Sequence, residues 1–250
     1  MVYSKLANRI SFNGRPYAHR GLWSPESVPE NSSGAFERAA SKGLGIELDV
    51  RLSRDFVPMV FHDRNLERMT GIAADVSDYN AVELQTIQLG ETNELIPTLS
   101  SLLDVWPVDL PILCEMKVET TDDPVRFARI IEDLVTPVKH QFAVMSFDAQ
   151  TIAAFSDHLQ RGRVIHPEAS REGVRLETEL RHIDPERIEF IACHTSDAEP
   201  VHEWAQTAGL PNLIWTVRSP ATINHLKSIS SGLIFEAINP DLLRSPSRNI

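Results

Sequence analysis

The sequence Gly45-Ile46-Glu47-Leu48-Asp49-Val50 alternates aliphatic and acidic side chains. Successive side chains of a β-strand point to opposite faces of the sheet, so Glu47 and Asp49 share one face and the aliphatic residues share the other. In a barrel, the aliphatic face of such a strand would pack against helices. The two carboxylates would then converge on the inner face, which makes this segment a candidate for chemistry as well as for the sheet.

Short apolar, β-branched runs recur outward from this segment, and helix-length stretches separate most of them. The runs are Tyr17–His19, Gly45–Arg51, Pro58–His62, Leu110–Lys117, Phe142–Ser146, Arg163–Ile165, Ile188–Cys193, Leu213–Val217 and Leu233–Glu236. Alternating strands and helices predict a parallel sheet, open or closed. A single domain of 250 residues is typical of an α/β barrel.

The alternation of strands and helices is first interrupted between Val50 and Met59. The segment between them is too short for a parallel crossover with a full helix. The second and third runs are therefore expected to form a local hairpin or a tight crossover. The sequence has nine strand-like runs, whereas an α/β barrel has eight strands, so one run is not expected to be a barrel strand.

Segments with the residue spacing of helices lie between most of the strand runs. In Ser33–Lys42, apolar or small residues recur at i, i+3, i+4 and i+7 from Phe36, and Asn31 or Ser32 precedes them as an N-cap. The other expected helices are Leu99–Val105, Pro124–Leu134, Ala149–His158, Glu172–His182, Val201–Ala208 and Ala221–Ile229.

Residues 64–97 interrupt the alternation of strands and helices a second time. This segment is polar, is rich in acidic residues and contains no strong strand run. We expect it to be a small inserted subdomain with one short helix near Ala81–Ile87. The chain as a whole, residues 1–250, is expected to be a single domain.

The net charge of the chain argues against two classes of binding partner. It carries 24 Lys and Arg against 35 Asp and Glu, a formal net charge of −11. Nucleic acids and anionic membranes bind basic surfaces, so neither is an expected partner.

Location is predicted from what the sequence lacks. There is no apolar run of about 18 residues, so no stable membrane insertion is expected, and Met1–Ile10 lacks the apolar region of a signal peptide. Cys114 and Cys193 lie in apolar runs and are expected to be buried thiols in a reducing compartment. The prediction is a cytoplasmic protein.

The acidic strand 45–50 has two interpretations. Inward-facing carboxylates are costly to bury unless a cation compensates them, and a hard divalent metal ion with oxygen ligands would do so. The alternative is a polar edge strand with Glu47 and Asp49 in water. In the run Leu110–Lys117, Glu115 and Lys117 also share one face, and Lys117 is either the ion-pair partner of Glu115 or a clamp for phosphate.

Histidines end two of the apolar runs. His19, followed by Arg20, closes one, and His62 closes another. These groups are expected at the mouth of a barrel, although either histidine, taken alone, is also consistent with a satisfied core residue. Taken together, four strand ends supply two histidines, three carboxylates, an arginine and a lysine, which is more than folding requires. The combination predicts an active site.

These segments resemble the glycerophosphodiester phosphodiesterase family. The resemblance rests on His19-Arg20-Gly21, Pro29-Glu30-Asn31-Ser32, Glu47-Leu48-Asp49-Val50, Phe61-His62-Asp63, Leu66-Glu67-Arg68-Met69-Thr70-Gly71, Ile96-Pro97-Thr98-Leu99, Glu115-Met116-Lys117, Ser146-Phe147 and Trp215-Thr216-Val217. It is dense from about residue 16 to 117 and patchy to about 240.

The resemblance implies a TIM-type (β/α)8 barrel with a small insertion after the His-Asp strand. It implies one divalent cation, Mg²⁺ or Ca²⁺, held by Glu47, Asp49 and Glu115. His19 and His62 would act as general acid and base. The expected reaction is hydrolysis of a glycerophosphodiester to sn-glycerol 3-phosphate and an alcohol, so the expected partner is a small-molecule phosphodiester.

The same resemblance implies phosphate contacts for Arg20 and Lys117. Trp215 is expected either to wall the pocket beside the substrate alcohol or to pack in the core. The end of the chain departs from the family pattern: where members commonly have Thr-Asp-x-Pro, this chain has Glu236 to Pro240 with Asn239 before the proline.

The same residues are compatible with other functions. A lysophospholipid or a sugar phosphodiester could be the substrate of the same bond cleavage. A non-catalytic phosphodiester-binding barrel is disfavoured because both histidines and all three carboxylates of the expected site are present. An amidohydrolase on the same fold is disfavoured because it usually needs paired histidines on the first strand, and Tyr17–Gly21 contains one.

Overall fold

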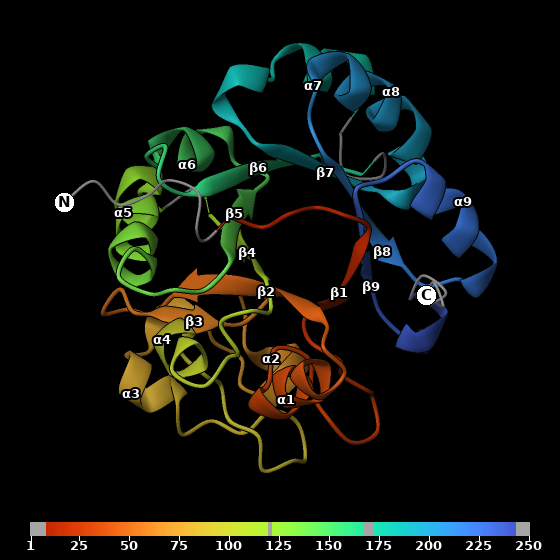
Figure 1. Ribbon diagram of the computed structural model, residues 1–250. Coiled ribbons are helices and arrows are strands. Elements are labelled where there is room, and N and C mark those ends of the chain that lie inside the picture. The colour runs from red at the N-terminus through yellow and green to blue at the C-terminus, as the bar shows by residue number, and fades with distance from the viewer. Residues whose placement is uncertain (1–8, 120–121, 168–172, 244–250) are drawn as a thin grey trace.

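Eight parallel strands form a closed barrel with helices around it (Figure 1). The computed structural model describes residues 9–119, 122–167 and 173–243. Its strands are β1 (Arg15–His19), β2 (Gly45–Leu52), β3 (Pro58–Val60), β4 (Ile112–Met116), β5 (Phe142–Ser146), β6 (Gln160–Val164), β7 (Phe190–His194), β8 (Asn212–Val217) and β9 (Gly232–Phe235). All of the predicted strand runs are confirmed, with ends that differ by up to three residues.

The barrel closes through β1. This strand pairs in parallel with β2 on one side and with β9 on the other, with Tyr17 opposite Gly45 and Ala18 opposite Phe235. No edge is therefore left among the eight parallel strands. The predicted TIM-type barrel is confirmed.

One of the nine predicted strand runs, Pro58–His62, does not belong to the barrel. β3 pairs antiparallel with β2, with Val50 opposite Val60 and Leu52 opposite Pro58. The short connection thus forms a hairpin, as one of the two interpretations predicted. β3 lies beside the end of β2 in the same sheet. The chain returns there toward Asp49, since Phe61 N–H donates to the Asp49 carbonyl at 3.0 Å, and His62 follows directly.

Helices cover the outside of the strands (Figure 1). They are α1 (Ser33–Ser41), α2 (Glu67–Thr70), α3 (Ala81–Leu84), α4 (Leu99–Leu103), α5 (Pro124–Val135), α6 (Ala149–Ala154), α7 (Leu176–Arg181), α8 (Ala198–Ala208) and α9 (Ile223–Ser228). Short 3-10 helices are Val76–Asp78, Pro185–Arg187, Thr195–Asp197, Pro220–Thr222 and Pro240–Leu243. Ser32 is the N-cap of α1, since its hydroxyl accepts from Ala35 N–H. The predicted start of α7 at Glu172 lies outside the described residues.

The alternation of β2 separates two apolar layers. Ile46, Leu48 and Val50 are fully buried in the layer between strands and helices. Tyr17 and Leu113 belong to a second cluster inside the barrel. Tyr17 and His19 lie two positions apart on β1 and share the inward face, so the apolar plug formed around Tyr17 supports the polar groups above it.

The segment between β3 and β4 has its own small core. Leu66, Val76, Leu84, Leu89 and Ile96 are buried together there. α3 begins where the helix near Ala81–Ile87 was predicted, but α2 and the 3-10 helix Val76–Asp78 were not predicted. Polar caps rather than apolar periodicity define the 3-10 helix, in which Asp78 accepts from the N–H of Asp75 at 2.9 Å. α2 has no side-chain cap and ends at Gly71, whose backbone is left-handed.

Two sequence expectations about environment can be compared with the fold. Cys114 and Cys193 are both free and buried, as predicted, and burial raises the pKa of each thiol. Across the described parts of the chain, no helix is long and apolar enough to cross a membrane. Most of Met1–Ile10, on which the signal-peptide argument depends, lies outside the described residues.

Candidate active site

A cavity of about 550 Å³ opens at the carboxyl ends of the barrel strands. Its lining includes seven of the eight predicted site residues: His19, Arg20, Glu47, His62, Glu115, Lys117 and Trp215. Asp49, the eighth, is completely buried beneath these groups. Because the residues come from β1, β2, β4, β8 and the hairpin, only closure of the barrel brings them together.

Three carboxylates form the base of the cavity. Glu47, Asp49 and Glu115 each offer an oxygen atom within 4.8 Å of the others. The side chains are 1%, 0% and 9% exposed. Asp49 on β2 lies directly opposite Glu115 on β4 in the parallel register, so the two strands hold the acids side by side.

The carboxylates differ in protonation because their partners differ. Burial raises the pKa of Glu47 well above its ordinary range, and the nearby charges of Asp49 and Glu115 raise it further. Burial alone would raise the pKa of Asp49 too, but Lys117, His62 and Arg20 outweigh that effect and lower it. Ionisation of Glu47 would therefore add negative charge that the neighbouring lysine and arginine do not fully neutralise.

Two cations contact this cluster. Lys117 Nζ lies 3.1 Å from Asp49 Oδ1 and also contacts Glu115. Arg20 Nε lies 3.2 Å from Asp49 Oδ2, and Arg20 Nη1 lies 2.8 Å from Glu30. Burial opposes the charge of Lys117, but the surrounding carboxylates raise its pKa above the ordinary value.

The turn after β1 places Arg20. Arg20 has a positive φ of 57° and its backbone N–H donates to Glu47 Oε2 at 3.2 Å. Asn31, with φ of 55°, donates its N–H to the Arg20 carbonyl at 2.9 Å and its side-chain amide to Asp49 at 2.9 Å. Left-handed backbone is uncommon for arginine, whereas asparagine tolerates it better, and hydrogen bonds to Glu47 and Asp49 hold this turn.

His19 and His62 each contact a carboxylate through Nδ1. His19 Nδ1 lies 2.5 Å from Glu236 Oε2, while its Nε2 lies 3.8 Å from Glu47 Oε2. His62 Nδ1 lies 2.6 Å from Asp63 Oδ1. Burial lowers the pKa of His62; the Asp49 carboxylate opposes this change, whereas the Lys117 charge adds to it. His62 is therefore biased toward its neutral form.

An aromatic wall faces the carboxylates across the cavity. Phe147 meets Trp215 edge to face with ring centroids 5.8 Å apart, and His194 meets Trp215 at 5.4 Å. Phe147 also contacts His166 at 4.7 Å. Trp215 is half-buried; it packs against the inner barrel cluster and also lines the cavity.

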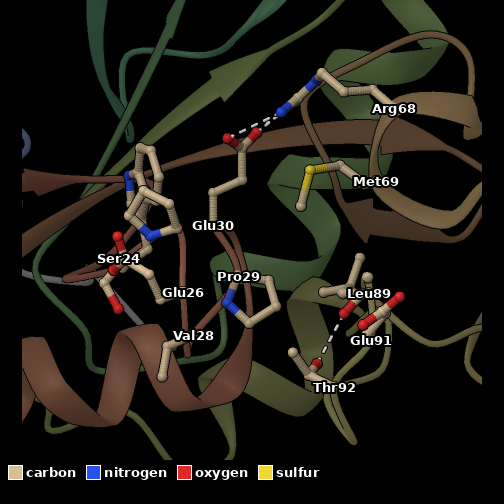
Figure 2. Close-up of a pocket in the computed structure, with 13 residues that line it drawn as sticks. Ser24, Glu26, Val28, Pro29, Glu30, Arg68, Met69, Leu89, Glu91 and Thr92 are labelled. Atoms are coloured by element: carbon tan, nitrogen blue, oxygen red, sulfur yellow. Dashed lines mark hydrogen bonds and ion pairs between the residues drawn. The ribbon is translucent and has the colours of Figure 1, made fainter.

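A second cavity of about 530 Å³ lies between the loop after β1 and the inserted segment (Figure 2). Its lining includes Trp23, Glu30, Arg68 and Met69. Figure 2 shows the Glu30 carboxylate paired with the Arg68 guanidinium, at distances of 2.6 and 3.2 Å. Arg68 also donates to Asp63 at 2.5 Å, so this pair connects the inserted segment to His62.

The carboxylate cluster is suited to a divalent cation. Glu47 Oε1 is buried and has no hydrogen-bond partner among the residues that the structure describes. Three clustered carboxylates supply the hard oxygen donors that Mg²⁺ and Ca²⁺ prefer. A cation here would supply the positive charge that Glu47 lacks, so the residues fit such an ion.

Sequence reasoning missed part of this site. Asn31, Asp63, Arg68 and Glu236 hold the predicted residues in place, but none of them was predicted to do so. Asn31, Asp63 and Arg68 nevertheless belong to motifs that carry the family resemblance, and Asp63 directly follows His62. Glu236 carried a different signal, as a departure from the family pattern at the end of the last strand.

Comparison with known sequences places this chain among relatives. It is 38% identical over 108 residues to a probable glycerophosphodiester phosphodiesterase 2 of Mycobacterium tuberculosis, covering 43% of this chain and 40% of that protein. It is 32% identical over 149 residues to a glycerophosphodiester phosphodiesterase of Caldanaerobacter subterraneus, covering 56% and 57%. The chain thus spans about half the length of these curated relatives.

The fold also has solved counterparts. An Oleispira antarctica phosphodiesterase, solved in complex with the product sn-glycerol-3-phosphate, superposes with a TM-score of 0.75 at 23% identity, covering 90% of this chain and 94% of that one. The model of the glycerophosphoryl diester phosphodiesterase family matches residues 19–237, which include all eight predicted site residues. This chain therefore belongs to the glycerophosphoryl diester phosphodiesterase family.

Proposed function

We propose that this protein is a metal-dependent phosphodiesterase that hydrolyses glycerophosphodiesters to sn-glycerol 3-phosphate and an alcohol. One observation carries the proposal: three clustered carboxylates and two carboxylate-paired histidines surround a single cavity at the mouth of the barrel. Family membership supports the reaction class, and the product bound to the Oleispira antarctica relative supports the glycerol phosphate half of the substrate.

Glu47, Asp49 and Glu115 are the proposed ligands of one divalent cation, Mg²⁺ or Ca²⁺. Buried carboxylates without enough protein cations support this assignment. When bound, the cation would neutralise charge on the phosphodiester and stabilise the additional charge of the transition state. Asp49 is further held by Asn31 and Lys117, which fixes its oxygens before an ion arrives.

His19 and His62 are the proposed acid–base pair. Each ring uses Nδ1 to contact a carboxylate, so Nε2 is the atom that exchanges a proton with the substrate. One imidazole takes a proton from the nucleophile, which is water or a neighbouring substrate hydroxyl. The other imidazole gives a proton to the departing alkoxide. Such transfers typically contribute ~10²–10⁴ each to the rate.

Arg20 and Lys117 are the proposed phosphate contacts. An arginine guanidinium has five N–H donors and a lysine ammonium has three. In this site Lys117 contacts two carboxylates, and Arg20 contacts Asp49 and Glu30. Each cation therefore retains donor capacity for a phosphate oxygen while remaining fixed by its acidic partners.

Trp215 is proposed to wall the part of the cavity that receives an organic group of the substrate. Its contacts with Phe147 and His194 give that side an aromatic surface. Trp215 Nε1 is buried and has no hydrogen-bond partner in the described parts of the chain, so it can donate to a hydroxyl oxygen.

The test is release of sn-glycerol 3-phosphate by the purified protein from glycerophosphocholine and glycerophosphoethanolamine with a divalent cation present. Release from either substrate would support the proposal. A lysophospholipid and a sugar phosphodiester, tested in parallel, address the alternatives. Turnover of only one of those two would assign the same chemistry to a different substrate, and product binding without turnover of any of them would indicate a non-catalytic barrel.

A further inference from the structure

Glu236 lies between His19 and Arg218, and no predicted role uses it. Its Oε2 atom is 2.5 Å from His19 Nδ1, and its Oε1 atom is 2.6 Å from Arg218 Nε. The Glu236 side chain is 10% exposed, whereas Arg218 is 56% exposed. Each carboxylate oxygen therefore has its own partner, and the carboxylate has a fixed orientation.

The strand register produces this contact. β9 pairs in parallel with β1, with Ala18 opposite Phe235, so the next residues along the two strands are His19 and Glu236. Glu236 N–H donates to the Val217 carbonyl on β8 at 3.2 Å. The glutamate is thus anchored to β8 and lies beside His19 as part of the barrel closure.

The chemistry of the pair determines where the His19 proton lies. Burial opposes ionisation of Glu236, but the hydrogen bond with His19 and the contact with Arg218 outweigh it and lower the pKa of Glu236 to about 2. An ionised carboxylate only accepts hydrogen bonds. His19 Nδ1 must therefore carry the proton that it donates to Glu236.

We infer that Glu236 is a positioning residue that holds His19 in the Nδ1–H tautomer and turns Nε2 toward the reacting atoms. His19 Nε2 is 3.8 Å from Glu47 Oε2, on the carboxylate side of the cavity. The catalytic consequence of this arrangement rests on the proposed function. The tautomer itself does not, because the hydrogen bond exists without substrate.

The variant Glu236→Gln separates this role from a role in packing. Arg218 is a donor only, so the amide oxygen of the glutamine is expected to face Arg218. The amide NH2 then faces His19 and needs an acceptor at Nδ1. An almost isosteric change is thereby expected to transfer the His19 proton to Nε2, the wrong tautomer for a reacting Nε2 acceptor.

The direct readout is NMR of protein labelled with ¹⁵N at histidine, at a pH where the neutral ring predominates. The His19 signal is identified by its loss in His19→Gln. We expect Nδ1–H in the wild type and Nε2–H in Glu236→Gln. Glu199→Gln is the matched control, because Glu199 pairs with His225 at 2.7 Å on the exposed surface. It should alter His225 and leave His19 unchanged.

Kinetics test the consequence for turnover. Glu236→Gln is expected to lower kcat by roughly 10²-fold or more, with KM changed less than about twofold, because the proposed phosphate contacts remain. An Nε2–H tautomer in the wild type, an unchanged tautomer in Glu236→Gln, or a wild-type kcat in that variant would each overturn the inference. If the wild type hydrolyses no phosphodiester, the proposed function fails, while the NMR result still decides the tautomer.

Discussion

Among single residues, His19 and His62 are expected to affect turnover most directly. His19→Ala and His62→Ala should each reduce kcat by ~10²–10⁴ while the protein stays folded, because each removes one proton transfer. Glycerol phosphate release and thermal unfolding provide the measurements. His225→Ala is the control, since His225 is exposed and pairs with Glu199 away from the cavity. Near-wild-type kcat in either active-site variant would refute its acid–base role.

The lowered pKa of Glu236 predicts how the free energy of unfolding depends on pH. Its folded pKa of about 2 lies below the usual value of 4.5, so its ionisation stabilises the fold above pH 4.5. That contribution is lost as the pH falls through about 2. The difference in free energy of unfolding between wild type and Glu236→Gln should therefore shrink from pH 5 to pH 2. Urea unfolding measures it, and a difference independent of pH over this range would contradict the assignment.

The sequence predicts some residues of the site better than others. Glu47 and Asp49 were predictable because strand alternation places both on one face, and Glu115 and Lys117 follow the same rule. His19 and Glu236 are 217 positions apart, and only the parallel register of β1 and β9 brings them together. Contacts of this kind depend on how the barrel closes, which local spacing does not encode.

At the scale of elements, the turn between β1 and α1 depends on Gly21. Its φ is +82°, and a Cβ atom there would lie 2.8 Å from Ala35 Cβ in α1. Gly21→Ala should thus combine backbone strain of about 1 kcal/mol with overpacking of roughly 1–3 kcal/mol. Gly14→Ala is the matched control, because Gly14 has φ of +73° and nothing within 4 Å of the added Cβ.

Denaturant unfolding of these two variants separates the two causes. Gly14→Ala should lose about 1 kcal/mol from the strain alone. Gly21→Ala should lose clearly more and should also reduce activity, since the turn carries Arg20. Equal losses in the two variants would show that Ala35 yields to the methyl group and that the close approach does not constrain the turn.

Elements were predictable where a pattern was long and strong. The alternation in β2 and the apolar faces of α1 and α5 gave their positions within a few residues. The β2–β3 hairpin stayed ambiguous because a short connection suits more than one geometry. α2, with four residues, escaped prediction because so short a helix has no apolar periodicity.

At the scale of the whole molecule, we predict one domain that contains the inserted segment. The segment's cluster around Leu84 and Leu89 includes Met59 of β3, so it shares a strand residue with the sheet. Differential scanning calorimetry should show one cooperative transition, with equal calorimetric and van't Hoff enthalpies. Leu84→Ala should lower the temperature of that whole transition. A separate early transition in this variant would show that residues 64–97 unfold independently.

The proposed reaction requires a divalent cation in the carboxylate cluster. The most direct test of this requirement is sn-glycerol 3-phosphate release from glycerophosphocholine by metal-stripped protein, with Mg²⁺, Ca²⁺ or Mn²⁺ added back singly. We predict no release without metal and saturable restoration by at least one cation, with weaker apparent affinity for that cation in Glu47→Gln. Equal release by the metal-stripped and reloaded protein would show that hydrolysis does not depend on a cation in this cluster.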